Sequence, residues 1–118
     1  MTEGAFMPGE DIFPEIITTL PRADVPLEGV RSYLLQGAGR QIVFTEYDVA
    51  VEAPEEAHEA QWVVVLAGEV ELTLGGETAT HRRGDTYYIP AEALHRARVA
   101  AGTRLQNLFD RPDRYRPK

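Results

Sequence analysis

Apolar and polar residues alternate along most of the chain in short runs that end at glycine or proline. Residues 69–74 (Glu-Val-Glu-Leu-Thr-Leu) alternate strictly, which is typical of a half-buried strand. Residues 61–66 are almost continuously apolar, as in a strand buried on both faces. Comparable runs predict further strands at residues 30–35, 41–51, 78–82, 86–89, 94–99 and 103–109.

Turn signals separate these runs and fix the fold class. They are Gly37-Ala38-Gly39, Pro54-Glu55-Glu56, Gly75-Gly76, Gly84-Asp85 and Ala101-Gly102. The Gly75-Gly76 pair permits the positive φ angles of a two-residue hairpin, and Pro54 is expected to end the strand before it. Many short strands at such spacing predict an all-β sandwich or barrel, and no helical period is long enough for βαβ units.

The 118 residues suffice for one domain with its own core. We expect an N-terminal arm and lead-in over residues 1–29, the barrel over 30–109 and a charged tail over 110–118. The apolar side chains between Ile12 and Leu20 predict a helical turn or an edge strand. The tail, with two prolines, is expected to be a surface strap or a disordered end.

Charge and composition exclude several function classes. The net charge is −7, and the sequence has no basic stripe with interleaved aromatic residues. Binding to nucleic acid or to an anionic membrane is therefore disfavoured. No apolar run approaches the length of a membrane span, and acidic residues stand where a secretory signal would be basic, so a cytoplasmic location is expected. The absence of cysteine removes thiolate chemistry, and a single lysine, Lys118, disfavours Schiff-base chemistry. Serine occurs only at Ser32, and neither a nucleophile elbow nor a phosphate-binding loop is present.

Two histidine-bearing segments carry the candidate chemistry. The first runs from Glu56 through His58 and Gln61 to Gly68, and the second from Gly84 through Pro90 to His95. Antiparallel strands would bring the two histidines together. Two imidazole nitrogens with nearby oxygen donors suit a first-row divalent metal.

These segments resemble the two motifs of the cupin superfamily, G-x5-H-x-H-x3,4-E-x6-G and G-x5-P-x-G-x2-H-x3-N. The second is matched at Gly84, Pro90 and His95, with Glu92 in place of its glycine and Val99 in place of its asparagine. In the first, His58 falls at the second histidine, Glu56 at the first histidine, and Gln61 at the glutamate. The matched region covers residues 56–99.

The resemblance implies a single-domain double-stranded β-helix, or jelly roll, with a site in the barrel mouth, and a homodimer formed through an outer sheet face. It implies Fe, Mn, Ni or Zn bound by His58, Gln61 and His95, with Glu56 as a further ligand or as a general base. A neutral Gln61 oxygen would leave the metal a better Lewis acid than a carboxylate would. For each residue a structural reading stays open: Glu56 and His58 as solvated loop residues, Gln61 and His95 as hydrogen-bonded barrel lining.

Three functions remain open, because the fold alone hosts many. The first is a metal-binding cupin that binds a small oxygen-rich organic molecule, with or without catalysis of the dioxygenase, isomerase or uronate- and sugar-processing classes. The second is a metal-free, non-catalytic ligand-binding or sensor protein. It is suggested by Glu56 in place of the first histidine of the motif and by Gln61 in place of its glutamate. The third is a structural role in a larger assembly.

Strand alternation assigns the remaining conspicuous side chains to faces. Trp62 is expected on the outer face, opposite to Gln61, in the outer layer or a dimer interface. Tyr33, Tyr47 and Tyr88 are candidates to line the barrel or fill its core. Four charged residues are expected to point outward and His81 to be a surface residue without function; the four are Glu69, Glu71, Arg96 and Arg98.

Overall fold

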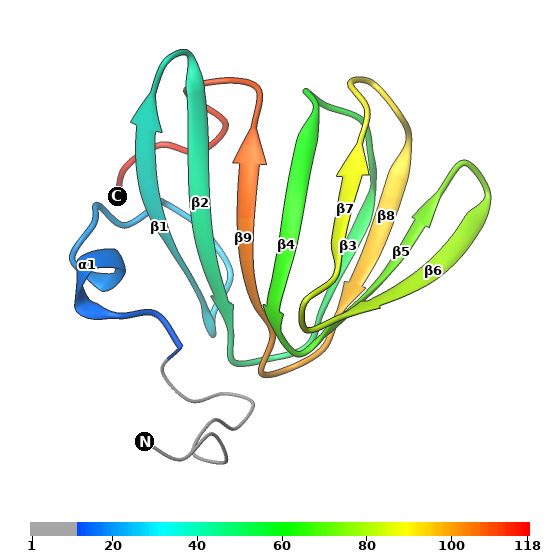
Figure 1. The fold of residues 1–118 in the computed structure, drawn as a ribbon, viewed down its shortest axis with the longest axis horizontal. Coiled ribbons are helices and arrows are strands. Elements are labelled where there is room, and N and C mark those ends of the chain that lie inside the picture. The colour runs from blue at the N-terminus through cyan, green and yellow to red at the C-terminus, as the bar shows by residue number, and fades with distance from the viewer. Residues whose placement is uncertain (1–11) are drawn as a thin grey trace.

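Two antiparallel β-sheets packed face to face make up most of the chain. The computed structural model describes residues 12–118, and within them nine strands and one helical turn are present (Figure 1). They are α1 (Glu15–Thr18), β1 (Val30–Gly37), β2 (Arg40–Tyr47), β3 (Val51–Glu56), β4 (Gln61–Ala67), β5 (Glu69–Leu74), β6 (Glu77–Arg82), β7 (Thr86–Ile89), β8 (His95–Val99) and β9 (Arg104–Phe109).

The strand order confirms the predicted all-β jelly roll. One sheet has the order β1-β2-β9-β4-β7 and the other β3-β8-β5-β6. Because the chain passes repeatedly from one sheet to the other, most connections cross between the sheets at the two ends of the sandwich. We call the lower end in Figure 1, where β2–β3, β4–β5, β6–β7 and β8–β9 connect, the closed end. The opposite end, with the β3–β4 and β7–β8 connections, is the mouth.

One predicted strand is wrong in its extent. Residues 41–51 were expected to form a single strand that ends before Pro54, but β2 ends at Tyr47 and β3 runs from Val51 through Pro54 to Glu56. The chain changes sheets between the two strands. Proline is tolerated in β3 because β3 is an edge strand, and because the register shifts between Ala53 and Glu56.

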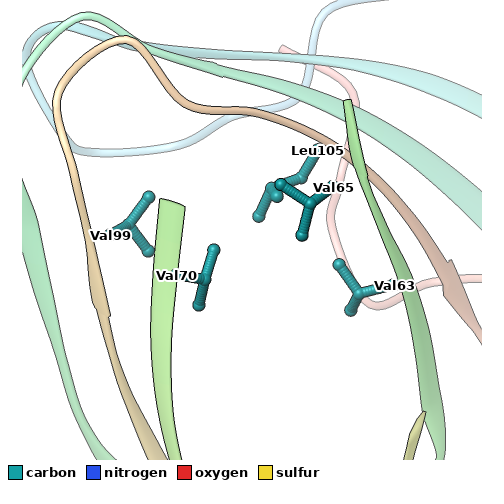
Figure 2. Close-up of a cluster of buried hydrophobic side chains, with 5 residues drawn as sticks. All are labelled: Val63, Val65, Val70, Val99 and Leu105. Atoms are coloured by element: carbon teal, nitrogen blue, oxygen red, sulfur yellow. The ribbon is translucent and has the colours of Figure 1, made fainter. Parts of the chain in front are cut away.

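Aliphatic side chains from both sheets form the core between them. Val63 and Val65 of β4 and Leu105 of β9 face Val70 of β5 and Val99 of β8 (Figure 2). All five are nearly inaccessible to solvent. Burial of such side chains stabilises the sandwich by about 1.5–3 kcal/mol each, and their inward direction leaves the alternate positions of the same strands on the outer faces.

Arg104 is fully buried at the closed end, where it links the connection after β2 to β9. Its guanidinium donates to the carbonyl oxygens of Tyr47 (3.2 Å) and Thr103 (3.1 Å) and to Asp48 (3.2 Å). Arg31 donates to Asp48 (2.7 Å) and to Glu46 (3.0 Å). The hydrogen bond from Arg31 holds the pKa of Asp48 below its usual range, so this network stabilises the fold at neutral pH and weakens as acid protonates that carboxyl.

The lead-in and the tail pack on the sandwich and on each other. Phe13 makes edge-on ring contacts with Tyr33 and Phe44 on the outer face of the five-stranded sheet. A bridge pairs Ala23 with Pro117. The tail is therefore a strap held against the barrel. The part of the sequence before residue 12 lies outside the described residues. Over residues 12–118, no helix is long and apolar enough to cross a membrane.

The close approach of Gly68 to Thr103 gives a test of the closed end. Gly68 has φ +81°, and a Cβ built there would lie 2.5 Å from the Cα of Thr103. We expect Gly68→Ala to lower the free energy of unfolding by about 3 kcal/mol or more, through overpacking and backbone strain together.

Gly84→Ala is the matched control, because Gly84 has φ +91° but open space around the same position. Only the strain of about 1–2 kcal/mol applies there. Urea unfolding followed by circular dichroism measures both variants. Equal losses of stability would contradict the assigned role of the Gly68–Thr103 contact.

Candidate metal centre

Two loops and the start of the tail build the mouth of the barrel. Residues 57–60 connect β3 to β4, and residues 90–94 connect β7 to β8. The backbone amide of Glu92 donates to the carbonyl oxygen of His58 (2.8 Å), and that of Asp110 donates to Ala60 (3.0 Å). These backbone hydrogen bonds fix the loop that carries His58 against the segment that precedes His95.

Glu92 adopts a left-handed backbone conformation, with φ 63°. It occupies the position at which the second cupin motif has glycine. The positive φ angle explains the glycine of the motif, because glycine adopts this conformation without strain. The strained turn lets the Glu92 amide reach His58. A side chain at this position costs about 1–2 kcal/mol relative to an unstrained one.

The rings of His58 and His95 lie 4.7 Å apart at an interplanar angle of 86°. The Nδ1 atom of His58 is 2.8 Å from the carbonyl oxygen of Glu59, and Nδ1 of His95 is 3.0 Å from that of Ala93. A carbonyl oxygen only accepts hydrogen bonds, so in both rings Nδ1 carries the hydrogen. The lone pair of each neutral ring is then on Nε2, which is the arrangement of a metal-binding histidine.

A one-residue bulge turns Glu56 toward His95. On β3 and β8, Ala53 pairs with Ala97 and Glu56 pairs with His95, so three steps on β3 match two on β8. Without the extra residue, strand alternation would turn Glu55 inward instead. The result is a group in which one ligand atom from each of Glu56, His58 and His95 lies within 4.8 Å of the others.

Gln61, the fourth predicted ligand, lines the same cavity from the first position of β4. Its amide nitrogen donates to Oδ1 of Asn107 (3.0 Å), and the Asn107 amide in turn donates to the carbonyl oxygen of Val43 (3.2 Å). Because its nitrogen is committed to Asn107, Gln61 can offer its carbonyl oxygen to a metal or ligand. All four residues named from the sequence therefore lie at one cavity.

The cavity has a volume of about 110 Å³ and a wall of mixed polar and apolar side chains that includes three phenols. These are Tyr47, Tyr87 and Tyr115, and burial raises the pKa of each. They are therefore neutral hydroxyl groups at neutral pH. Of the tyrosines proposed from the sequence, only Tyr47 lines this cavity.

Tyr33 and Tyr88 lie elsewhere. Tyr33 donates to Glu46 (2.9 Å), away from the cavity, and Tyr88 is exposed on the outer face beside its cross-strand partner Trp62. The sequence did contain a signal for Tyr87, because a four-residue strand that places Tyr88 outward must place Tyr87 inward. Trp62 itself is partly exposed, on the face expected for it.

His81 is not an isolated surface residue as expected. Its ring lies 4.6 Å from that of Tyr87, and its side chain is half-buried. It pairs with Val70, an inward-facing position, so it points toward the interior from the edge strand β6. The four outward charged residues predicted from alternation are exposed; they are Glu69, Glu71, Arg96 and Arg98.

Sequence reasoning missed the contribution of the tail to the site. Arg114 donates to Oε1 of Glu56 (3.2 Å), and both Arg114 and Tyr115 line the cavity. The tail is held there by Gln41, a fully buried residue of β2. Gln41 donates to the carbonyl oxygen of Tyr115 (2.9 Å) and accepts from its amide (3.0 Å). No pattern in the sequence marked Gln41 for this role, because its burial is visible only in the fold.

The chain belongs to the cupin family. The model of that family, described as the Cupin domain, matches residues 43–108, which is more than half of the chain. No curated protein matches the sequence.

Solved structures of the same fold agree with this assignment. An RmlC-like cupin from Shewanella frigidimarina is 23% identical with a TM-score of 0.71, over 92% of this chain and 96% of that one. KdgF from Halomonas sp. is 20% identical with a TM-score of 0.66, over 77% of this chain and 87% of that one. A single-residue variant of oxalate decarboxylase from Bacillus subtilis is 16% identical with a TM-score of 0.67, over 81% of this chain and 28% of that one. At these identities the likeness shows the fold.

The strain at Glu92 predicts a stabilising substitution at the mouth. We expect Glu92→Gly to raise the free energy of unfolding by about 0.5–1 kcal/mol, because relief of the left-handed strain exceeds the added entropy of the unfolded chain. Glu92→Ala keeps the strain and should leave the stability within about 0.5 kcal/mol of the parent protein. Thermal unfolding measures both. A loss of stability in Glu92→Gly would show that the side chain, and not the backbone, matters at this position.

Proposed function

We propose that this protein is a metal-dependent cupin that binds a small oxygen-rich organic molecule in the mouth of its barrel. The metal would be held by His58, His95 and Glu56, with Gln61 as a further oxygen donor. The observation that carries the proposal is the ligand-atom group of these two histidines and Glu56, together with the Nδ1 contacts that leave both Nε2 atoms free.

The donor set fits a first-row divalent ion. Two imidazole nitrogens and one carboxylate suit Fe, Mn, Ni or Zn, and resemble the two-histidine, one-carboxylate set of non-haem iron sites. When bound, such an ion would polarise an oxygen atom of the ligand as a Lewis acid. The grouping of the Glu56 carboxylate with the histidines favours a ligand role over that of a free general base.

The chain's own residues would orient the bound molecule. Apolar side chains form part of the wall, and the neutral hydroxyls of Tyr47, Tyr87 and Tyr115 are hydrogen-bond donors at its lining. Oxalate and mannose 6-phosphate, which appear in the names of two proteins with this fold, are oxygen-rich small molecules. They support the ligand class but do not choose a reaction.

Metal content tests the proposal. We expect tag-free protein, loaded with Fe, Mn, Ni or Zn and then desalted, to hold nearly one ion per chain. His58→Ala and His95→Ala should each lower metal affinity by at least about 100-fold, since each removes a ligand of the ion. Elemental analysis and calorimetry measure the occupancy and the affinity.

His81→Ala is the matched control, because His81 contacts Tyr87 but is not part of the ligand group. It should bind metal as the parent protein does. Parent protein that takes up none of the four ions while remaining folded would contradict the proposal.

The alternative is a metal-free ligand-binding or sensor protein. The hydrogen bond from Arg114 to Glu56 favours it, because this pair already neutralises the carboxylate that a metal would otherwise use. Native mass spectrometry would distinguish the two. Retention of an organic ligand without metal, in both the parent protein and His95→Ala, would favour the alternative.

We also propose that the protein forms a homodimer through the outer face of the five-stranded sheet. One register row crosses all five strands and is wholly apolar; it consists of Leu35, Ile42, Leu108, Trp62 and Tyr88. Phe13 covers the neighbouring row, at Tyr33 and Phe44. A row about 19 Å long can pair with itself about a two-fold axis, and a second copy would bury it.

Substitution at the centre of this row tests the dimer. We expect Trp62→Glu to raise the dimer dissociation constant by about 30-fold or more, as loss of a central aromatic contact does. Thr73→Glu, on the other sheet, should leave association unchanged. Sedimentation velocity over a range of concentrations measures both. A monomeric parent protein would overturn the proposal.

A further inference from the structure

Arg114 brings a positive charge into the wall of the cavity. Its side chain is mostly buried, and it forms an ion pair with Glu56 (3.2 Å) and another with Glu59 (3.6 Å). Its guanidinium carbon lies over the rings of Phe109 (5.6 Å) and Tyr115 (5.4 Å). Packing and pairing thus hold this guanidinium beside the proposed metal ligand.

The charges of the cavity wall balance without a metal. Among the described residues that line the cavity, Glu56 and Arg114 are the charged side chains besides the two histidines. Glu59 lies behind this wall, where it pairs with Arg114 (3.6 Å) and is also paired with Arg111 (3.6 Å). His58 and His95 must be neutral to bind a metal. A divalent ion added to this wall therefore leaves an excess positive charge in a confined site, and Arg114 would repel that ion from the side of Glu56.

An anionic ligand would remove this excess. A carboxylate oxygen can bind a divalent ion, while a planar guanidinium matches the same or a second carboxylate through paired N–H donors. Arg114 has such donors to offer. Its Nε is buried against Glu59 Oε2, 3.6 Å away, so the donors left for a ligand are those of the terminal amino groups. Five N–H groups on one guanidinium exceed what the hydrogen bond to Glu56 uses.

We propose that Arg114 is a specificity-determining residue that selects a small organic carboxylate and couples its binding to that of the metal. The inference rests on the proposed metal site and names the ligand class of that site. In the absence of the carboxylate, Arg114 lowers metal affinity by repulsion and by its hold on Glu56. When the carboxylate is bound, its negative charge interacts with both Arg114 and the metal. Binding of the carboxylate therefore increases the affinity for the metal, and binding of the metal increases the affinity for the carboxylate.

Arg111 is a natural control on the same tail. It pairs with Asp113 (2.7 Å) and with Glu59 (3.6 Å), but its side chain is 57% exposed and does not line the cavity. Arg111→Met and Arg114→Met each remove one charge within the same short segment. The methionine at position 114 retains apolar contact with the two rings that Arg114 covers.

The experiment measures the binding of Mn²⁺ and of Zn²⁺ by calorimetry, alone and with saturating lactate, a small carboxylate. Lactamide, its neutral counterpart, replaces lactate in a parallel series. In the parent protein and in Arg111→Met we expect lactate, but not lactamide, to increase metal affinity by about tenfold. In Arg114→Met we expect metal alone to bind about tenfold more tightly than in the parent, with the effect of lactate lost.

Arg114→Lys separates charge from geometry. It keeps the repulsion, so the affinity for metal alone should match the parent, but it lacks the planar fork, so the lactate effect should be smaller. Thermal unfolding of each variant shows whether the tail is still held. The inference is overturned if Arg114→Met binds metal as the parent does and keeps the lactate effect. If neither ion binds to parent protein or to Arg114→Met, the metal site itself is absent and the proposed function fails with it.

Discussion

The rest of the fold depends on the contacts at the closed end, where Thr103 and Arg104 join three connections between the sheets. The Thr103 hydroxyl forms hydrogen bonds with the backbone of Glu69, at the end of the β4–β5 connection. The Thr103 carbonyl accepts a hydrogen bond from the amide of Tyr47, at the start of the β2–β3 connection. Arg104 holds the same β2–β3 connection by donating hydrogen bonds to the Tyr47 carbonyl and to Asp48. A buried arginine is costly unless its charge is paired and hydrogen-bonded, and Arg104 forms ion pairs with Asp48 (3.2 Å) and Glu46 (3.8 Å). This polar cluster therefore favours one arrangement of the crossovers. Gly68 is required there because the backbones approach too closely for any side chain.

With one end of the sandwich fixed in this way, the opposite end can be irregular and carry chemistry. The bulge in β3, the left-handed Glu92 and the short loop that bears His58 each depart from regular strand geometry. Each departure aims a polar group into the cavity or holds one that does. The strain is local, and it is offset by the rigid sheets behind it. The site is therefore made by exceptions to the strand pattern, whereas the core is made by the pattern itself.

This division explains what the sequence could predict. Alternation predicted most of the strands, and motif spacing predicted the shared site of His58, Gln61 and His95, which do line one cavity. The pattern could not place Glu56 with them securely, because a bulge changes the parity of every residue after it and leaves no compositional mark. The break between β2 and β3 was missed for a similar reason: a strand that changes sheets can remain apolar throughout. Arg114 was missed because a charged residue in a proline-containing tail resembles ordinary surface sequence until Gln41 is seen to hold its neighbour.

The clasp between Gln41 and Tyr115 has a kinetic consequence. These residues are separated by 74 positions, and Glu56 and Arg114 by 58, so the cavity wall closes only through contacts between distant parts of the chain. Closing such long loops costs entropy before any contact repays it, and folds built on distant pairings form slowly. The tail can pair only after β2 and β9 have assembled the surface that receives it. The barrel is thus expected to exist transiently with an open, uncompensated Glu56 at its mouth, and the binding site to be the last part of the molecule to mature.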